Sequence, residues 1–276
     1  MTDTPEISIC LASNRPSLWK NMHDNITATA NGLSFEMIVV GPKEADFQLP
    51  SNLKYIKTGN IKVPQCCEIS MQYACGKNMM IAADDCIFWG DKGFYNLYEA
   101  YNNFRNKIGN DNVAVVPSFK APGAGRQKLR YDKNMEAPIA SLNYSWFSKD
   151  LWDRLGGFDI SFVAVYHSCD LAMRFQENGI NILKSDDVVV KETSVPVGEI
   201  YLHRVCKPYD NAVLNSLWTR KTIEGEIVPS DSVWCFMRNR SYVVSKKRLK
   251  EIIKYKDEDI LTKSQGPKEY GGLVWE

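Results

Sequence analysis

Residues 78–86 read Asn-Met-Met-Ile-Ala-Ala-Asp-Asp-Cys, an apolar run that ends in two neighbouring acids. An apolar run of this length predicts a buried strand over 78–83, with Asp84 and Asp85 directly beyond its carboxyl end. Two adjacent carboxylates are costly to hold together unless a cation neutralises them. The pair therefore predicts either a site for a hard divalent ion such as Mg²⁺ or Mn²⁺, or only the end of a strand and the cap of a following helix.

Similar apolar runs lie on both sides of this segment, and each predicts another strand. They cover residues 7–11, 35–40, 53–56 and 113–117. Helical periodicity occupies the stretches between them, over residues 17–31, 64–75 and 91–107. Strands that alternate with helices of this length are typical of βαβ units and a parallel sheet. We therefore expect an α/β fold with a mostly parallel, Rossmann-like sheet flanked by helices, and ligands beyond the carboxyl ends of its strands.

The alternation breaks after residue 118. Residues 118–138 contain glycine, proline and several basic residues, and they predict a long loop of the kind that often forms a functional lid. Two short helices and two strands are expected to follow, near 148–156, 169–178, 180–183 and 187–191. Ser148 and Ser168 are the expected N-caps of the two helices. After about residue 212 the pattern changes to a charged tail, so we expect one domain over 1–212 and a C-terminal extension over 213–276 that packs on this domain or on a partner.

Composition and charge exclude several classes of protein. Of the 276 residues, 44% are hydrophobic and 24% charged, which is ordinary for a globular protein and too apolar for a disordered one. Lys and Arg number 34 against 33 Asp and Glu, so no global field favours nucleic acid. No apolar run approaches the roughly 20 residues that span a bilayer, and the acidic N-terminus does not resemble a secretion signal. We expect a cytoplasmic protein whose eight cysteines are reduced and mostly buried.

Four segments, taken in their order and spacing, resemble the family 2 glycosyltransferases of the GT-A fold. They are residues 9–16, 36–40, 74–85, and the Leu-Gly-Gly-Phe-Asp of 155–159 with the Asp-Leu-Ala-Met-Arg of 170–174. The resemblance spans about residues 7–205. It implies a metal-dependent enzyme, of the hexosyltransferase type, that moves a sugar from a nucleotide-diphosphate sugar to a hydroxyl of a glycan or glycolipid, with inversion at the anomeric carbon.

The resemblance also implies a metal site. In this family an Asp-x-Asp motif after the fourth strand holds the ion, and the matching positions here are Ala83, Asp84 and Asp85, so the first acid is missing. It implies Asp85 as the direct ligand of Mn²⁺ or Mg²⁺, with Asp84 beside it facing the ribose or the metal. His203 is placed to be a further ligand, and it could equally be an ordinary histidine near a strand end.

The acidic pair in which this family places its catalytic base is replaced here by His167 and Ser168. Three interpretations stay open. Asp170 could act as the base, although an acid in the first turn of a helix also interacts favourably with the helix dipole. His167 could act instead, because an unperturbed imidazole has a pKa near 6.5. The third interpretation is a catalytically silent protein that binds a sugar nucleotide or a glycan on the same fold.

The donor is expected to contact the loops that follow the first strands. The first loop would supply Ala12, Ser13 and Arg15, the last as a charge for phosphate. Gly41 stands where many members of the family have an acid that reads uracil, so the donor base is left open. Two further donor contacts are expected from Lys62 and Gln65, at the start of the second helix.

Trp146 and Gly157 are the expected acceptor contacts. No nucleic acid partner and no transmembrane segment are expected, while the basic residues 246–254 leave peripheral membrane contact open. A nucleotidyltransferase is a weaker alternative, because such an enzyme would carry a glycine-rich phosphate loop after its first strand. Residues 12–15 contain no glycine.

Overall fold

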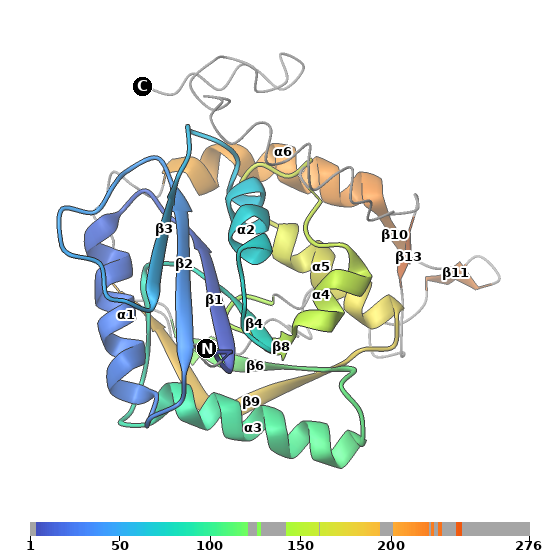
Figure 1. Cartoon of the computed structure of the whole chain (residues 1–276). Helices are drawn as coiled ribbons and strands as arrows, with labels where there is room; N and C mark the ends of the chain where they lie inside the picture. Colours follow the sequence, from blue (N-terminus) through green and yellow to red (C-terminus); the bar gives the residue numbers. More distant parts are fainter. Residues whose placement is uncertain are drawn as a thin grey trace.

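The computed structural model describes residues 4–120, 126–127, 142–159, 161–193, 201–220, 222–223, 226–227 and 236–238. Their main sheet has the strand order β3-β2-β1-β4-β8-β6-β9-β5, with β7 beside β6 (Figure 1). Its strands are β1 Ile7–Ala12, β2 Phe35–Gly41, β3 Leu53–Lys57, β4 Asn78–Ala82, β5 Cys86–Phe88, β6 Val113–Lys120, β7 Arg126–Gln127, β8 Trp146–Ser148 and β9 Asn181–Glu192. The helices are α1 Pro16–Thr29, α2 Val63–Gln72, α3 Gly93–Ile108, α4 Lys149–Leu155, α5 His167–Glu177 and α6 Tyr201–Leu217.

The sheet is mixed, whereas the sequence predicted a mostly parallel one. Strands β3, β2, β1 and β4 are parallel neighbours, as the βαβ pattern predicted. Strand β8 runs antiparallel to both β4 and β6, and β5 runs antiparallel to β9. Strands β6 and β9 run parallel. Apolar periodicity locates a strand but carries no information about its direction, which explains why the antiparallel pairings of β8 and β5 were not predicted.

Apolar side chains cover both faces of the sheet, and the helices lie against them (Figure 1). Helices α1 and α3 cover one face with Trp19, Met22, Ile26, Phe94, Leu97 and Tyr101. Helices α2, α4 and α5 cover the other with Ile69, Met71, Leu151, Leu171 and Phe175. Because both faces are buried, the strands read as continuous apolar runs rather than as alternating ones.

Local signals placed some helix ends correctly and others not. Ser148 caps α4 as predicted, because its Oγ accepts the Leu151 N–H at 3.4 Å. Helix α5 begins at His167, so Ser168 lies in its first turn and is not its N-cap. The two strands expected near 180–183 and 187–191 are a single strand, β9, paired with β6 across a register shift at Pro117 and Ser118.

Helix α6 crosses residue 212, where the sequence pattern changes. Leu214, Leu217 and Trp218 pack against Phe162 and Met173, so this part of the expected extension contacts the core of the domain. Two small antiparallel pairs follow it, β10 Trp218–Arg220 with β13 Phe236–Arg238 and β11 Thr222–Ile223 with β12 Glu226–Ile227. Residues 239–276, most of the expected 118–138 loop, and the 246–254 segment lie outside the described residues.

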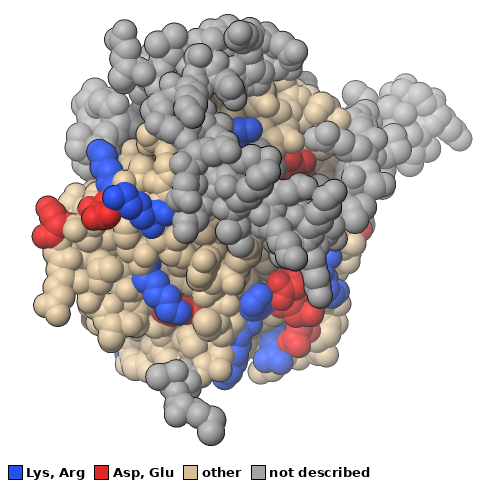
Figure 2. Space-filling model, turned by 45° about the horizontal axis from the view of Figure 1, so that its top comes forward, with Lys and Arg blue, Asp and Glu red and all other residues tan. Residues whose placement is uncertain are grey.

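The mixed surface charge and the mostly buried cysteine thiols of the described residues agree with what the composition led us to expect. On the face drawn in Figure 2, basic and acidic side chains lie side by side rather than forming one broad patch of a single sign. The described cysteines are free thiols, of which Cys75 is exposed, Cys169 half-buried and the others buried. No helix in the described part of the chain is long and apolar enough to cross a membrane.

Gly41 ends β2 directly against the loop that follows β1. A Cβ atom at this position would overlap the backbone oxygen of Ser13. The Ser13 N–H donates to Val40 O at 3.0 Å, and Gly41 O accepts from the Tyr55 hydroxyl at 2.7 Å and from the Thr58 N–H at 3.0 Å. The absence of a side chain at Gly41 therefore allows β2 and the first loop to approach closely.

We expect Gly41→Ala to lower the free energy of unfolding by about 3 kcal/mol, because the new methyl group meets backbone that cannot rotate away. Urea denaturation measures the loss. Gly109→Ala is the control, since Gly109 has φ +78° and open space around it, and it should lose only about 1 kcal/mol. A loss at Gly41 no larger than the loss at Gly109 would contradict this account.

Candidate functional site

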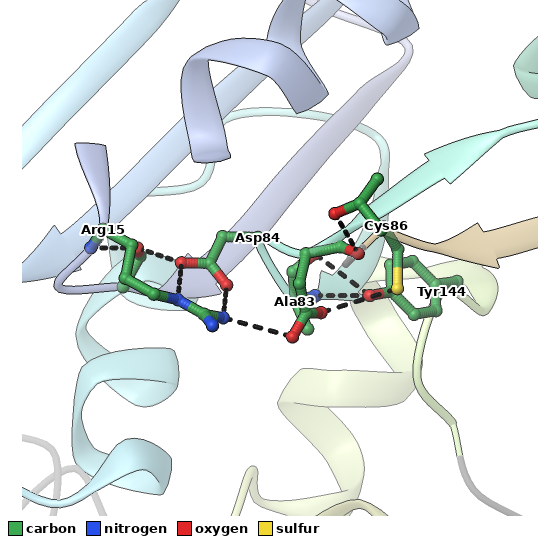
Figure 3. A network of polar contacts seen from close by, with 8 residues as sticks. Arg15, Ala83, Asp84, Cys86 and Tyr144 are labelled. Carbon is green, nitrogen blue, oxygen red and sulfur yellow. Dashed lines mark hydrogen bonds and ion pairs between the residues drawn. The ribbon is translucent and has the colours of Figure 1, made fainter. Parts of the chain in front are cut away.

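The carboxyl ends of β1, β2 and β4 lie side by side at one edge of the sheet, because the three strands are parallel neighbours. The loop after β1 carries Ser13 and Arg15, and the turn after β4 carries Asp84 and Asp85. Figure 3 shows the Arg15 side chain directed at the Asp84 carboxylate. In open α/β sheets ligands bind at this edge. The structure therefore brings together two segments that lie about 70 residues apart in the sequence.

Asp84 is a buried carboxylate that accepts hydrogen bonds from the first loop. Arg15 Nε donates to Asp84 Oδ2 at 3.0 Å, and Arg15 Nη2 donates to Asp84 Oδ1. Ser13 Oγ donates to Asp84 Oδ2 as well (Figure 3). Burial raises the pKa of the Asp84 carboxyl, and the hydrogen bonds and charge of Arg15 act in the opposite direction. Because every partner here donates, the arrangement suits an ionised carboxylate.

Asp85 is the more exposed member of the pair. Its side chain is 20% exposed, against 3% for Asp84, and its Oδ2 lies 3.2 Å from Arg15 Nη2. Its backbone oxygen accepts from the Thr193 N–H at 2.6 Å and from Thr193 Oγ1 at 2.8 Å. On the other side of the turn, the Tyr144 hydroxyl donates to Ala83 O at 3.0 Å. These bonds fix the backbone that presents Asp85.

Two carboxylates and one guanidinium carry a net charge of −1, so the cluster keeps an affinity for a further cation. Among the residues that the structure describes, no three His, Cys, Asp or Glu side chains converge as ligands. The cluster does fit an ion held by one exposed carboxylate, Asp85, together with oxygens of a bound diphosphate and water, which is how Mg²⁺ commonly binds. His203 lies in α6 rather than near a strand end, and its side chain lies outside the described residues.

Glu192 is an acid near this cluster that no sequence motif pointed to. It ends β9, where it pairs in register with Cys86 of β5. Burial raises the pKa of the Glu192 carboxyl, the negative charge of Asp85 raises it further, and Arg15 lowers it. Only the pairing of β5 with β9, which is not visible in the sequence, brings this acid toward Asp85.

The other expected donor contacts lie around the same edge, with different degrees of access. Ala12 is the half-buried last residue of β1, and Gly41 packs on Ser13. Gln65 is buried in the first turn of α2, where its Oε1 accepts the Lys62 N–H at 3.0 Å. Burial lowers the pKa of Lys62, while Asp210 and Asp159 raise it. The hydrogen bond between the Lys62 N–H and Gln65 Oε1 stabilises the start of the helix, so a donor could reach this oxygen only by displacing the bond.

The two expected acceptor residues are buried in packing contacts. Trp146 has no exposed surface and packs against Phe94, Tyr98 and Tyr101. A sugar cannot reach its ring, so the expectation that Trp146 contacts an acceptor is wrong. Its place in β8 points the ring toward α3, which a sequence pattern of only three strand residues does not reveal.

Gly157 has φ +69°, and a Cβ atom there would overlap the carboxylate of Glu68. Glu68 is buried in α2, and its Oε1 accepts the N–H of Phe158. The Gly-Gly-Phe-Asp segment is therefore held by a carboxylate of α2. Glycine at 157 is needed for this close approach, whatever contact it makes with an acceptor.

Asp170, one of the two candidate bases, is buried with both oxygens engaged. Arg174 Nε donates to Oδ2 at 3.0 Å, and Trp218 Nε1 donates to Oδ1 at 2.8 Å. Arg174 also donates to the backbone oxygens of Leu155 and Gly157. The Asp170 carboxylate thus links α5, the Gly-Gly segment and the end of α6, an arrangement typical of a structural role.

His167, the other candidate base, is the first residue of α5 and is also buried. Its ring meets the ring of Phe158 edge to face, with centroids 4.7 Å apart. Its backbone N–H donates to Val165 O at 2.9 Å. Its position therefore depends on the segment that leads into the helix.

Asp210 of α6 fixes that segment, and the sequence analysis did not select it. Its fully buried carboxylate accepts three consecutive backbone N–H groups, those of Val163 at 2.7 Å, Ala164 at 2.9 Å and Val165 at 2.7 Å. Burial raises the pKa of Asp210, and these three bonds lower it. A lone acid in a helix gives no sequence signal for a contact with residues 45–47 positions away.

We expect Asp210→Asn to lower the free energy of unfolding by about 2 kcal/mol, because Ala164 and Val165 both donate to Oδ2 and an amide nitrogen in that place leaves buried donors unsatisfied. Faster hydrogen exchange of the 163–167 amides should accompany the loss. The control Asp24→Asn removes an exposed ion pair with Lys20 and should change stability by no more than about 0.5 kcal/mol. Unchanged exchange of the 163–167 amides would refute the assignment.

Comparison with known proteins gives a likeness in fold. No protein-family model and no curated protein sequence matches the chain. Among solved structures, the mannosyltransferase PcManGT from Pyrobaculum calidifontis, in complex with GDP-Man and Mn²⁺, is similar with a TM-score of 0.55 and 20% identity over 75% of this chain and 61% of that one.

Two further structures are similar at lower identity. S. aureus TarS 1-349 has a TM-score of 0.50 and 14% identity over 68% of this chain and 60% of that one. GalNAc-T7 with UDP, GalNAc and Mn²⁺ has a TM-score of 0.51 and 11% identity over 78% of this chain and 51% of that one. The chain thus spans between 51% and 61% of the lengths of these structures. The chain therefore shares the fold of these three structures, and membership of the GT-A glycosyltransferases of family 2 stays a prediction.

Proposed function

We propose that this chain is a glycosyltransferase that binds a nucleotide-diphosphate sugar at the carboxyl ends of β1, β2 and β4 and transfers the sugar to an acceptor hydroxyl. The observation that carries the proposal is the Arg15–Asp84–Asp85 cluster at this edge. The similarity to PcManGT and GalNAc-T7, whose structures contain a nucleotide or nucleotide sugar and Mn²⁺, supports it.

Each element of the cluster has a task in such a reaction. Arg15 can donate N–H groups to a diphosphate oxygen, which accepts strong charge-assisted hydrogen bonds. Asp85 is the proposed ligand for Mn²⁺ or Mg²⁺, with His203 as a second. A bound ion of this kind offsets the negative charge that develops on a leaving diphosphate. Ala12, Ser13 and Gly41 form the wall against which the nucleoside would lie.

We assign the acceptor side to the segment that joins the Gly-Gly-Phe-Asp residues to α5. An inverting transfer needs a base that removes the proton of the acceptor hydroxyl. His167 is the proposed base, because the Asp170 carboxylate is already engaged by Arg174 and Trp218. Asp170 would then position α5 rather than touch the acceptor. A glycan or glycolipid as acceptor is carried over from the family resemblance alone.

A silent sugar-nucleotide- or glycan-binding protein is the second candidate. The replacement of the family's acidic pair by His167 and Ser168 favours it, as does the burial of both residues. The two candidates differ in turnover. A silent protein binds the donor and never releases free nucleotide from it.

Incubation with UDP-, GDP-, TDP- and CMP-sugars in the presence of Mn²⁺ tests the proposal. We expect one donor class to release free nucleotide, and Asp85→Asn to reduce that release at least about 100-fold because charge on the diphosphate is no longer offset. Asp24→Asn, an exposed acid outside the site, is the matched control and should retain the activity. Donor binding without turnover would favour the silent protein, and no binding of any donor would contradict both the transferase and a silent sugar-nucleotide-binding protein.

Replacement of the two candidate bases separates their roles. His167→Gln should lower the transfer rate by about 10² or more while donor binding persists, because the proton of the acceptor hydroxyl then has no base to receive it. Asp170→Asn should instead lower the melting temperature, because it leaves Arg174 buried without its counter-charge. If Asp170→Asn is stable but inactive, Asp170 is the base and His167 the positioning residue, which contradicts our assignment.

A further inference from the structure

The contacts of Arg15 in the cluster differ in strength. Its bond to Asp84 is bidentate and buried, with the Asp84 side chain 3% exposed. Its contact with Asp85 uses one nitrogen, is longer at 3.2 Å, and lies between side chains that are 18% and 20% exposed. The bidentate pair is therefore the stable anchor, and the Asp85 contact is the one that breaks first.

We propose that Arg15 is an exchangeable counter-ion of Asp85, which competes with a divalent cation until a diphosphate draws its N–H group away. In the structure Arg15 donates to both carboxylates. In the donor-bound protein the bidentate bond to Asp84 stays, and the second N–H of Nη2 donates to a diphosphate oxygen in place of Asp85. This inference rests on the proposed function, since it names the residue that couples cation and donor at the same site.

Elementary electrostatics supports the exchange. The lone pair of Asp85 Oδ2 that faces Arg15 cannot accept its N–H and bind a cation at the same time. A guanidinium 3.2 Å from that oxygen also repels any cation bound to it, because the two positive charges would lie within a few ångströms of each other. A cation alone therefore binds weakly, and the negative diphosphate relieves the repulsion by taking the guanidinium as a partner. Cation and donor then strengthen each other's binding, and the coupling is reciprocal.

The buried anchor explains why the exchange is local. Asp84 is held by Ser13 as well as by Arg15, and Ser13 Oγ in turn accepts the backbone N–H of Arg15 at 3.0 Å. The backbone of Asp85 is held by Thr193. The proposed exchange therefore needs only small side-chain rotations that part Asp85 from Arg15, with no movement of either loop.

Two titrations of the full-length protein test this inference. In the first, Mn²⁺ is added without nucleotide and free Mn²⁺ is followed by electron paramagnetic resonance. We expect Arg15→Gln to bind Mn²⁺ at least about 10-fold more tightly than the wild type, because the competing cation is removed. In the second, UDP and GDP are titrated at saturating Mn²⁺, and Arg15→Gln should bind the preferred nucleotide at least about 10-fold more weakly, because the N–H donor to the diphosphate is lost.

Two controls separate competition from a general charge effect. Arg105→Gln removes one positive charge from an exposed pair with Asp111 and should leave both titrations at their wild-type values. Arg15→Gln combined with Asp85→Asn should lose the gain in Mn²⁺ affinity. If Arg15→Gln fails to fold, Arg15→Lys replaces it, because a single ammonium group cannot hold both carboxylates and should also bind Mn²⁺ more tightly than the wild type.

Opposite changes in the two titrations support the inference. Mn²⁺ affinity that is unchanged or lower in the Arg15 variant overturns it, since Arg15 then does not compete for Asp85. If the wild type binds neither UDP nor GDP at saturating Mn²⁺, and releases nucleotide from no sugar of the UDP, GDP, TDP and CMP panel, the proposed function loses its support. The Mn²⁺ titration still decides whether Arg15 competes with a cation.

Discussion

The buried ion pair between Arg15 and Asp84 is the interaction on which the candidate site depends. It joins the loop after β1 to the turn after β4, and it does so at the edge where parallel strands present their carboxyl ends. Burying a lone carboxylate at this point would be unfavourable, and the bidentate guanidinium together with Ser13 compensates for that cost. The result is a rigid base beside which Asp85 stays half-buried, with 20% of its side chain exposed.

A second buried network holds the segment to which we assign the acceptor. Glu68 of α2 accepts the backbone N–H of Phe158. Arg174 and Asp170 together connect the Gly-Gly segment to Trp218. Asp210 accepts the backbone N–H groups of residues 163–165. In each case a charged side chain from a helix fixes a piece of irregular backbone. Because helix α6 supplies Asp210 and the chain directly after it supplies Trp218, residues beyond 205 belong to the architecture of the site.

The sequence predicted those features that have a local or periodic signal. Apolar runs located β1, β2 and β4, and helical periodicity located α3. The rule that parallel strands end at one edge predicted that the loops carrying Ser13, Arg15 and Asp84 lie near one another. Features that depend on distant pairings were not predictable. The directions of β5 and β8, the burial of Trp146, the engagement of Asp170 by Trp218 and the contacts of Asp210 and Glu192 all arise from residues far apart in the chain.

The central claim is that Asp85 and Arg15 together receive a cation and the diphosphate of a nucleotide sugar. Crystals grown with Mn²⁺ and the preferred nucleoside diphosphate, with data collected at the manganese absorption edge, would locate both directly. The account predicts an anomalous peak bonded to Asp85 and to a diphosphate oxygen, with Arg15 turned from Asp85 to the diphosphate. A nucleotide bound elsewhere on the protein, or a diphosphate at this edge with Arg15 still on Asp85 and no manganese peak, would contradict it.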